Sequence, residues 1–389
     1  MLENSNELQC TVTTLAGFEE ILLEELKELG IENPVRGTRS AAFTGSLADV
    51  YRINYRSRFA IRVLIKIHSY KAFDDKRLHS KAMQFDWSSI MGLNDTFAIN
   101  AAVHSDYHHH SQFAALRIKD AIADFFNQKE GRRPSVDIKR PDIRVHLHID
   151  GQHVTLSLDS SGDSLHKRGY RTERFEAPLS EVLAAGMIKL SGWTPDQPFW
   201  DPMCGSGTLI CEAAMIALDI PSQIRRQRFG FMNWKNFDSK LWNEIKNEVS
   251  PKSELPALIK GSDMDRYSLP IVKKHLKNIG VDHLVQVEQL DYFKSELPAP
   301  DPMIIMNPPY GVRLPKEEIE EFYSRIASHM KHKLPGSTVW VFTSNMSSMK
   351  RFGLRPSKKL RLFNGSLECA YHKFEIFAGK RKDHLRSEN

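Results

Sequence analysis

Cysteine is scarce in this sequence, and no long apolar run is present. Only four cysteines occur among 389 residues, and no two of them form a CxxC pair. This spacing excludes a disulfide framework and the paired ligands of a zinc ribbon. No apolar stretch approaches the roughly 20 residues of a membrane-spanning helix, and the first nine residues, MLENSNELQ, lack the basic start and apolar core of a signal peptide. We therefore expect a cytoplasmic protein without membrane contact.

The chain is long enough for two or three domains and carries a net positive charge. Its formal charge of +6 and isoelectric point near 9.0 suit a polyanionic partner, although many basic proteins bind none. Three consecutive histidines follow Tyr107. Side chains of successive residues on an extended segment point in opposite directions, and no cysteine or acidic ligand stands at metal-ligand spacing, so we expect no metal.

Residues 198–214 have the pattern of a strand, a tight glycine turn and the start of a helix. In open α/β sheets ligands bind outside the carboxyl ends of strands, so such a turn can hold a nucleotide-like cofactor, and glycine lets the backbone approach it closely. The turn is not GxGxxG and no lysine follows it, which excludes a Walker-type phosphate site. Cys204 is interpreted as a small buried residue rather than a nucleophile. We predict cofactor contacts from Asp201, Pro202, Cys204, Gly205, Ser206, Gly207 and Thr208.

Acidic residues follow two further predicted strands. One strand leads to Asp263 and Met264, and the other leads to Asp291, Tyr292 and Phe293. A carboxylate at the first position can accept hydrogen bonds from a ribose diol. Asp291 can accept from an adenine amino group, while Tyr292 or Phe293 packs on the ring. Alone, each aspartate would be interpreted as a helix cap or a solvated loop residue, but three acids at three successive strand ends favour a cofactor site, to which we also assign Met264.

A fourth apolar run, residues 302–306, ends abruptly in Asn307-Pro308-Pro309-Tyr310. The two prolines prevent continued ladder bonding and stiffen the loop. The exocyclic amine of a nucleobase is a poor nucleophile because its lone pair is conjugated with the ring. The Asn307 side-chain oxygen and the Pro308 carbonyl can accept its N–H bonds and direct the lone pair toward an incoming methyl group, while Tyr310 offers a surface on which a flipped base stacks. In isolation the motif would be a rigid turn, but after the glycine turn it indicates methylation of an amino group.

The segments DPMCGSGT, GSDMD and NPPYG, in this order, resemble class I S-adenosylmethionine-dependent N-methyltransferases. Three further segments resemble the THUMP-domain RNA methyltransferases, and within them the branch that makes N2-methylguanosine in bacterial 23S rRNA: LHKRGYR at 165–171, APLSEVLAA at 177–185 and FNGSLEC at 363–369. The resemblance implies S-adenosylmethionine as cofactor, with Asp201 at its methionine end. It implies structured RNA, 23S rRNA or a large-subunit precursor, as partner. Some members continue into a second domain that makes 7-methylguanosine; because this sequence stops at Asn389, we expect only the first activity.

The predicted fold is α/β: a Rossmann-like, seven-stranded class I methyltransferase domain preceded by α+β ferredoxin-like and THUMP domains. Alternation predicts a strand at residues 59–67, and Asp150-Gly151 predicts a hairpin. The last predicted strands lie near residues 337–343, 360–363 and 368–377. The predicted boundaries are 1–57 for the ferredoxin-like domain, 58–162 for the THUMP domain, 163–177 for a linker and 178–389 for the methyltransferase domain.

Basic residues gather in two places. Such clusters are most often solvated faces, but on a THUMP-like domain they can contact phosphates and give salt-dependent affinity. The loop at residues 225–234 interleaves basic and aromatic residues, and it either lines an RNA cleft or packs across the edge of a sheet. We predict RNA contacts from Arg132, Arg133, Lys139 and Arg140, and at the entrance to the catalytic domain from Lys167, Arg168 and Arg171.

Three alternative functions stay open. An NPPY motif serves either base amine, so adenine N6 methylation in RNA or DNA is one alternative. A tRNA guanine-N2-methyltransferase also joins a THUMP domain to this catalytic core. From another class, the chain would be an RNA-binding ribosome assembly factor with a vestigial site. The intact acids and NPPY argue against the last, and the THUMP-like half with the FNGSLEC segment favours guanine in RNA.

Overall fold

The computed structural model describes residues 7–108, 110–171, 179–309 and 316–377. These residues form two compact units that exchange segments of the chain. Unit 1 contains the described residues up to Thr14, together with Leu22–Leu165 and Arg226–Glu248. Unit 2 contains Leu15–Ile21, His166–Arg225 and the described residues from Val249 onward.

Unit 1 is built on one sheet of seven described strands, in the order β2-β3-β1-β4-β7-β6-β5. Neighbouring strands run antiparallel, except that β5 and β6 are parallel. β4 pairs with β1 on one side and with β7 on the other, so the ferredoxin-like and THUMP regions share one continuous sheet. The strands are β1 (Leu8–Thr13), β2 (Val35–Gly37), β3 (Ser40–Gly45), β4 (Arg62–Lys71), β5 (Phe97–His104), β6 (Ile143–Asp150) and β7 (His153–Asp159).

Local sequence accounts for most of these elements. Alternate residues of β6 are buried, as expected for a strand with one face on the core, and the predicted hairpin is confirmed because Asp150 pairs with His153. The predicted strand at 59–67 was placed too early: β4 begins at Arg62, and its pairing with β7 continues to Lys71. Ser46 and Asp49 form a capping box at the start of α2. The helices outside residues 226–248 are α1 (Glu19–Glu28), α2 (Leu47–Arg56), α3 (Asp75–Ala82), α4 (Ser111–Glu130) and the 3-10 turn η1 (Trp87–Ser89).

Residues 226–248 supply unit 1 with η2 (Gly230–Asn233) and α7 (Ser239–Asn247). Phe231 stacks on Tyr51 with ring centroids 4.2 Å apart, and Trp242 meets Tyr51 edge-on at 5.9 Å. Of the two roles predicted for residues 225–234, the structure supports packing, because the aromatic rings of Phe229, Phe231 and Trp234 are buried.

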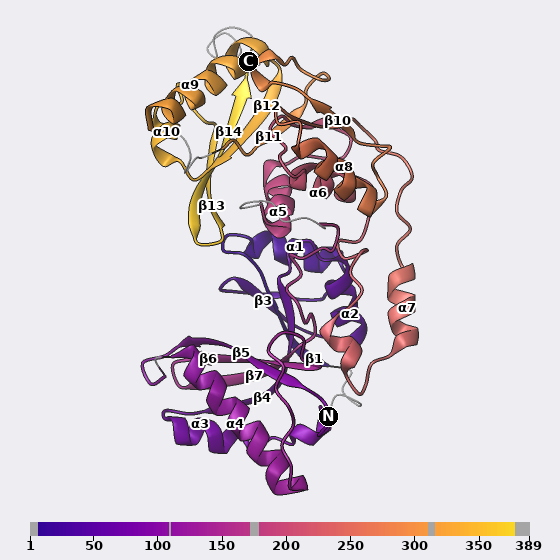
Figure 1. Cartoon of the computed structure of the whole chain (residues 1–389), viewed down its shortest axis with the longest axis vertical. Coiled ribbons are helices and arrows are strands. Elements are labelled where there is room, and N and C mark those ends of the chain that lie inside the picture. Colours follow the sequence, from indigo (N-terminus) through magenta and orange to yellow (C-terminus); the bar gives the residue numbers. More distant parts are fainter. Residues whose placement is uncertain (1–6, 109, 172–178, 310–315, 378–389) are drawn as a thin grey trace. The chain divides into compact units, whose positions relative to one another are not determined.

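Unit 2 is built on a second sheet of seven described strands, in the order β10-β9-β8-β11-β12-β14-β13. Figure 1 labels β10, β11, β12, β13 and β14 of this sheet. β8 to β12 are parallel, whereas β14 runs antiparallel to both of its neighbours. The strands are β8 (Phe199–Asp201), β9 (Ile259–Asp263), β10 (Gln286–Gln289), β11 (Met303–Met306), β12 (Ser337–Thr343), β13 (Lys358–Asn364) and β14 (Leu367–Ile376). The predicted seven-stranded sheet with an antiparallel strand in its last hairpin is confirmed.

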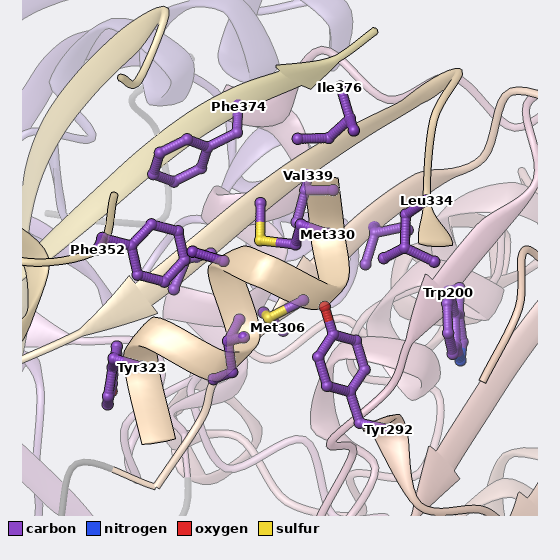
Figure 2. Packing of buried hydrophobic residues seen from close by; sticks show 14 of the residues in the cluster. Trp200, Tyr292, Met306, Tyr323, Met330, Leu334, Val339, Phe352, Phe374 and Ile376 are labelled. Atoms are coloured by element: carbon purple, nitrogen blue, oxygen red, sulfur yellow. The ribbon is translucent and has the colours of Figure 1, made fainter. Parts of the chain in front are cut away.

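Helices cover both faces of this second sheet. On one face α9 packs over β11, β12 and β14, where Met330 of α9 lies among Met306, Val339 and Phe374 (Figure 2). On the other face the Tyr371 hydroxyl donates to the Met187 carbonyl of α5 at 2.9 Å. The helices are α5 (Glu181–Ser191), α6 (Thr208–Ala217), α8 (Ser268–Ile279), α9 (Lys316–Lys333), α10 (Met346–Lys350) and the 3-10 turn η3 (Tyr292–Lys294).

Candidate active site

The glycine turn lies between the carboxyl end of β8 and the start of α6. Gly205 and Gly207 have φ of +50° and +78°, a region that glycine enters without strain. A Cβ on Gly207 would lie 2.8 Å from Cγ1 of Val272 on α8, whereas a Cβ on Gly205 would meet no described residue within 4 Å apart from its chain neighbours. The turn is therefore packed tightly on its α8 side and leaves open space above Gly205.

Three acids stand at one edge of the sheet because β8, β9 and β10 are parallel neighbours. Asp201 ends β8, Asp263 ends β9 and Asp291 follows β10. One Asp263 carboxylate oxygen accepts the Gly205 N–H at 2.8 Å, and the other accepts the Asp265 N–H at 2.9 Å. Asp263, at the end of β9, thus fixes the glycine turn that follows β8.

The environment of the turn disfavours negative charge. Asp201 is 2% exposed; burial raises its pKa well above the ordinary value, and the neighbouring Asp263 carboxylate raises it further. The Met203 N–H, which donates to Asp201 at 3.2 Å, opposes this shift. Burial also raises the pKa of the Cys204 thiol well above its ordinary value. Cys204 is thus buried and protonated, which agrees with its interpretation as a small packing residue.

Asp291 and Tyr292 have different surroundings although they are adjacent. Asp291 accepts the Phe293 N–H at 3.0 Å and so caps η3. The Tyr292 ring is 3% exposed and lies under α9, with its centroid 4.6 Å from His329 and 6.4 Å from Trp200 (Figure 2). A ring buried in this way has no free face, so we withdraw the Tyr292 side chain from the predicted cofactor contacts.

Two exposed apolar side chains follow Asp263. Met264 is 71% exposed and Tyr267 is 68% exposed. Arg266 lies over the Tyr267 ring at 4.8 Å and donates to its hydroxyl at 2.8 Å. We assigned Met264 to the cofactor site from the sequence and did not consider Tyr267.

β11 is buried along its whole length and delivers Asn307 to the same edge. The Asn307 Oδ1 atom is buried and accepts no hydrogen bond from any residue that the structure describes. Pro308 is buried and Pro309 is exposed, while Tyr310, the fourth residue of the predicted motif, lies outside the described residues. Buried amide oxygens nearly always have a donor, so this one is a candidate acceptor for an N–H group of a ligand.

Arg168, which was predicted to contact RNA, is instead internal to unit 2. It is fully buried, with Nε 3.5 Å from Oε1 of Glu212 on α6. The Tyr170 hydroxyl donates to the same Glu212 oxygen at 3.2 Å. A fully buried guanidinium cannot reach RNA, and its removal would leave the buried Glu212 charge uncompensated. We therefore withdraw Arg168 from the predicted RNA contacts.

Arg171 also supports α6. Its guanidinium donates to the Leu179 carbonyl at 2.6 Å and to the Thr208 hydroxyl, and its Nε lies 3.4 Å from Glu181. Thr208 begins α6 directly after the glycine turn, so its hydroxyl is engaged within the fold. These contacts clamp the first turn of the helix that follows the cofactor loop.

The other predicted RNA contacts are exposed. Lys167 lies on unit 2, and the remaining four residues lie on unit 1. Arg133 forms an ion pair with Asp124 at 2.9 Å, while the backbone N–H groups of Lys139 and Arg140 donate to Asp137 at 2.8 and 3.0 Å.

The part of the chain that the structure describes holds no group of three or more His, Cys, Asp or Glu side chains arranged for a metal. Among the same residues, every helix is too short or too polar to cross a bilayer. The four cysteines are buried and free.

Three family models match successive parts of the chain: an RlmL ferredoxin-like domain at residues 9–64, a THUMP domain at 72–159 and an RMKL-like methyltransferase domain at 168–373. The protein slr0064 of Synechocystis sp. (strain ATCC 27184 / PCC 6803 / Kazusa), provisionally named an RNA methyltransferase, is 37% identical over 368 residues, which cover 94% of this chain and 96% of that protein. The chain belongs to the RMKL-like methyltransferase family. The family and fold class expected from the sequence are thereby confirmed.

Other members of the RMKL-like family are longer. The ribosomal RNA large subunit methyltransferase K/L of Syntrophotalea carbinolica is 38% identical over 381 residues, covering 94% of this chain and 53% of that protein. The chain therefore spans about half the length of the K/L relatives that it matches.

Solved structures agree with the assignment. SMU.472, provisionally described as a methyltransferase and crystallised with SAH, superposes with a TM-score of 0.85 at 27% identity, over 97% of this chain and 100% of that one. A protein of Listeria monocytogenes, described as a predicted N6-adenine-specific DNA methylase, superposes with a TM-score of 0.84 at 27% identity, over 95% and 96% of the two chains.

Proposed function

We propose that the protein transfers a methyl group from S-adenosylmethionine to the exocyclic N2 amine of a guanosine in 23S rRNA. The observation that carries the proposal is the buried Asn307 Oδ1 at the end of β11, an acceptor with no donor among the residues that the structure describes. The THUMP domain match supports an RNA substrate. The names of the K/L relatives support large-subunit rRNA as the substrate. A ribosomal substrate in turn supports a cytoplasmic location. Guanine at N2 rests on the resemblance of the motifs.

The glycine turn fits S-adenosylmethionine, which supplies an electrophilic methyl group on a sulfonium when it is bound. The space above Gly205 admits a ligand against the backbone. Asp201 is held in a setting that raises its pKa, so a positively charged methionine end is favoured beside it. Asp263 would hold the ribose and Asp291 the adenine amino group, and Met264 would contact the cofactor.

Asn307 and Pro308 would hold the target amine. Two acceptors, the Asn307 Oδ1 and the Pro308 carbonyl, match the two N–H bonds of an exocyclic amine. Hydrogen bonding to both fixes the nitrogen with its lone pair directed toward the cofactor, and positioning of this kind lowers a barrier by several kcal/mol. As the nitrogen gains positive charge on accepting the methyl group, both acceptors would stabilise it until a proton is lost to solvent.

The sequence-based boundaries at 57, 162 and 177 remain our proposal for the domain division. The exposed basic residues on unit 1 and Lys167 remain proposed RNA contacts. Their expected contribution is affinity that is independent of sequence and falls with salt.

Replacing Asn307 with Ala tests the role of the orphan acceptor. We expect turnover to fall by about 10²–10³-fold, the effect of removing one preorganised transition-state hydrogen-bond partner, while affinity for S-adenosylmethionine stays near wild type. Single-turnover methylation and isothermal titration calorimetry measure the two quantities. Equal loss of turnover and cofactor affinity would remove Asn307 from its assigned role.

Nucleoside mass spectrometry of fractionated rRNA and tRNA identifies the product. Cells that lack the protein, or that carry only the Asn307→Ala form, should lose one N2-methylguanosine from 23S rRNA. If an adenine or tRNA methylation is missing instead, the proposed mechanism stands and the proposed substrate is wrong. Cofactor binding without any methyl transfer by the wild type would favour the assembly-factor alternative.

A further inference from the structure

Positive charge is concentrated in one stretch of the catalytic unit. Residues 322–367 contain nine Lys and Arg residues and no Asp or Glu. Because the whole chain has a formal charge of +6, the residues outside this stretch sum to a charge of −3. Six of the nine basic residues lie between positions 350 and 361, at the end of α10, in the loop after it and on β13.

Strand register places β13 at the level of the candidate active site. Met306 pairs with Val341 on β12, Val341 pairs with His372 on β14, and His372 pairs with Lys359 on β13. Lys359 is therefore level with the last residue of β11, and Arg361, two residues further on, is level with Pro308. The two strands are three places apart, or about 14 Å at the usual strand spacing.

The side chains of Lys359 and Arg361 project from the same face of the strand because residues two apart share a face. Both side chains are exposed. The Arg361 side chain is 81% exposed and forms an ion pair with Glu368 at 3.5 Å. Burial lowers the pKa of His372, which pairs with Lys359 across the strands, and the charge of Lys359 lowers it further. Phe363, next on this face, is 38% exposed.

Lysines on an edge strand also prevent edge-to-edge aggregation. That role does not require the α10 end and the following loop to be basic, yet Lys350, Arg351 and Arg355 are exposed there. Arg351 and Arg361 form ion pairs with Glu320 and Glu368, but the cations outnumber these two acids. A surface with this excess of positive charge and an exposed aromatic ring beside it fits a nucleic acid strand, whose phosphates bind cations and whose bases stack.

We infer that β13 and the end of α10 bind the phosphates of the RNA strand that flanks the nucleotide to be methylated. This inference rests on RNA being the substrate in the proposed function. It gives the catalytic unit an RNA surface of its own, separate from the basic residues of the THUMP region.

The test compares two charge-matched double variants of the full chain, Lys359→Gln/Arg361→Gln and Lys331→Gln/Lys333→Gln. The second pair is exposed at the carboxyl end of α9, which leads into the opposite, amino end of β12. Filter binding measures the affinity for protein-free 23S rRNA transcript between about 50 and 200 mM salt. Thermal unfolding and calorimetry with S-adenosylmethionine verify that each variant is folded.

We expect the slope of log affinity against log salt to become shallower by about 1.4 to 1.8 for the β13 variant, since each lost phosphate contact accounts for roughly 0.7 to 0.9. The α9 variant should keep the wild-type slope. A wild-type slope in the β13 variant, or an equal change in both variants, overturns the inference. This test measures RNA binding and not methylation, so the two proposals can fail independently. If the wild type methylates no guanosine, the proposed function is wrong, but the binding measurement still tests this inference.

Discussion

At the scale of single residues, the buried carboxyl group of Asp201 makes the stability of the fold depend on pH. Its carboxyl group is enclosed beside Asp263, and its pKa is raised above the ordinary value of 3.8. A raised folded-state pKa means that the folded protein holds the proton more tightly than the unfolded chain does. Stability is therefore lost as pH rises from about the ordinary value through the folded value. In the proposed function, a bound cation at this position would reverse the penalty.

Asp201→Asn should stabilise the protein without cofactor at neutral pH and weaken cofactor binding. The amide keeps an oxygen for the Met203 N–H but removes the enclosed charge. We expect a higher unfolding temperature at pH 8, with the gain shrinking as pH is lowered toward 3.8. Affinity for S-adenosylmethionine should fall by roughly 10- to 150-fold, the equivalent of a charge-assisted hydrogen bond. A destabilised variant at pH 8 would contradict this account.

Two effects of replacing Gly207, backbone strain and overpacking, can be separated with a matched control variant. Gly207 and Gly192 have the same φ of +78°, but the Cβ of an alanine would meet Val272 at 2.8 Å only at position 207, while position 192 is open. Gly192→Ala should lose about 1–2 kcal/mol of unfolding free energy from backbone strain. Gly207→Ala should lose a further ~1–3 kcal/mol from overpacking. Urea denaturation measures both, and equal losses would show that α8 yields to the added methyl group.

At the scale of elements, sequence patterns predicted the sheet of unit 2 and the strand ends that carry Asp201, Asp263, Asp291 and Asn307. Periodicity identifies strands because each one buries a regular set of side chains. It cannot say which distant group will meet a loop residue, so the burial of Arg168 against Glu212 was missed.

The same limit applies to side-chain direction. Asp291 and Tyr292 are neighbours in sequence, but only the chain path after β10 decides that the ring enters the core beneath α9. Likewise, the basic and aromatic pattern of residues 225–234 left an RNA cleft and packing both open, and the partner that decides for packing, Tyr51 of α2, lies far away in the sequence. Contacts between distant segments are the part that local pattern does not encode.

At the scale of the whole molecule, each unit is completed by a segment from the other half of the sequence. Unit 2 includes Leu15–Ile21, where Phe18 packs so closely on α5 that a Cβ on Gly186 would lie 2.0 Å from its ring. Unit 1 includes Arg226–Glu248. Neither unit is therefore a continuous stretch of chain.

A fragment of residues 1–165 should consequently be incomplete. Without η2 and α7, Tyr51 and Tyr55 lose the aromatic rings of Phe231 and Trp242 that cover them. We expect the fragment to bind a hydrophobic dye and to unfold at a lower temperature than after addition of a synthetic peptide of residues 226–248. A peptide with serine in place of both aromatic residues is the control. A fragment that unfolds cooperatively, without dye binding or any response to the peptide, would argue against this dependence.

The exchange of segments also governs when the protein can finish folding during its synthesis. Once Leu165 has been added, 83 further residues must be translated before Glu248 exists, a delay of roughly 4 to 17 s at 5–20 residues per second. Through that interval the emerging chain presents an uncovered aromatic face on α2. The THUMP-bearing half is thus a natural client for ribosome-associated chaperones, and slow codons between positions 165 and 248 would lengthen its exposure.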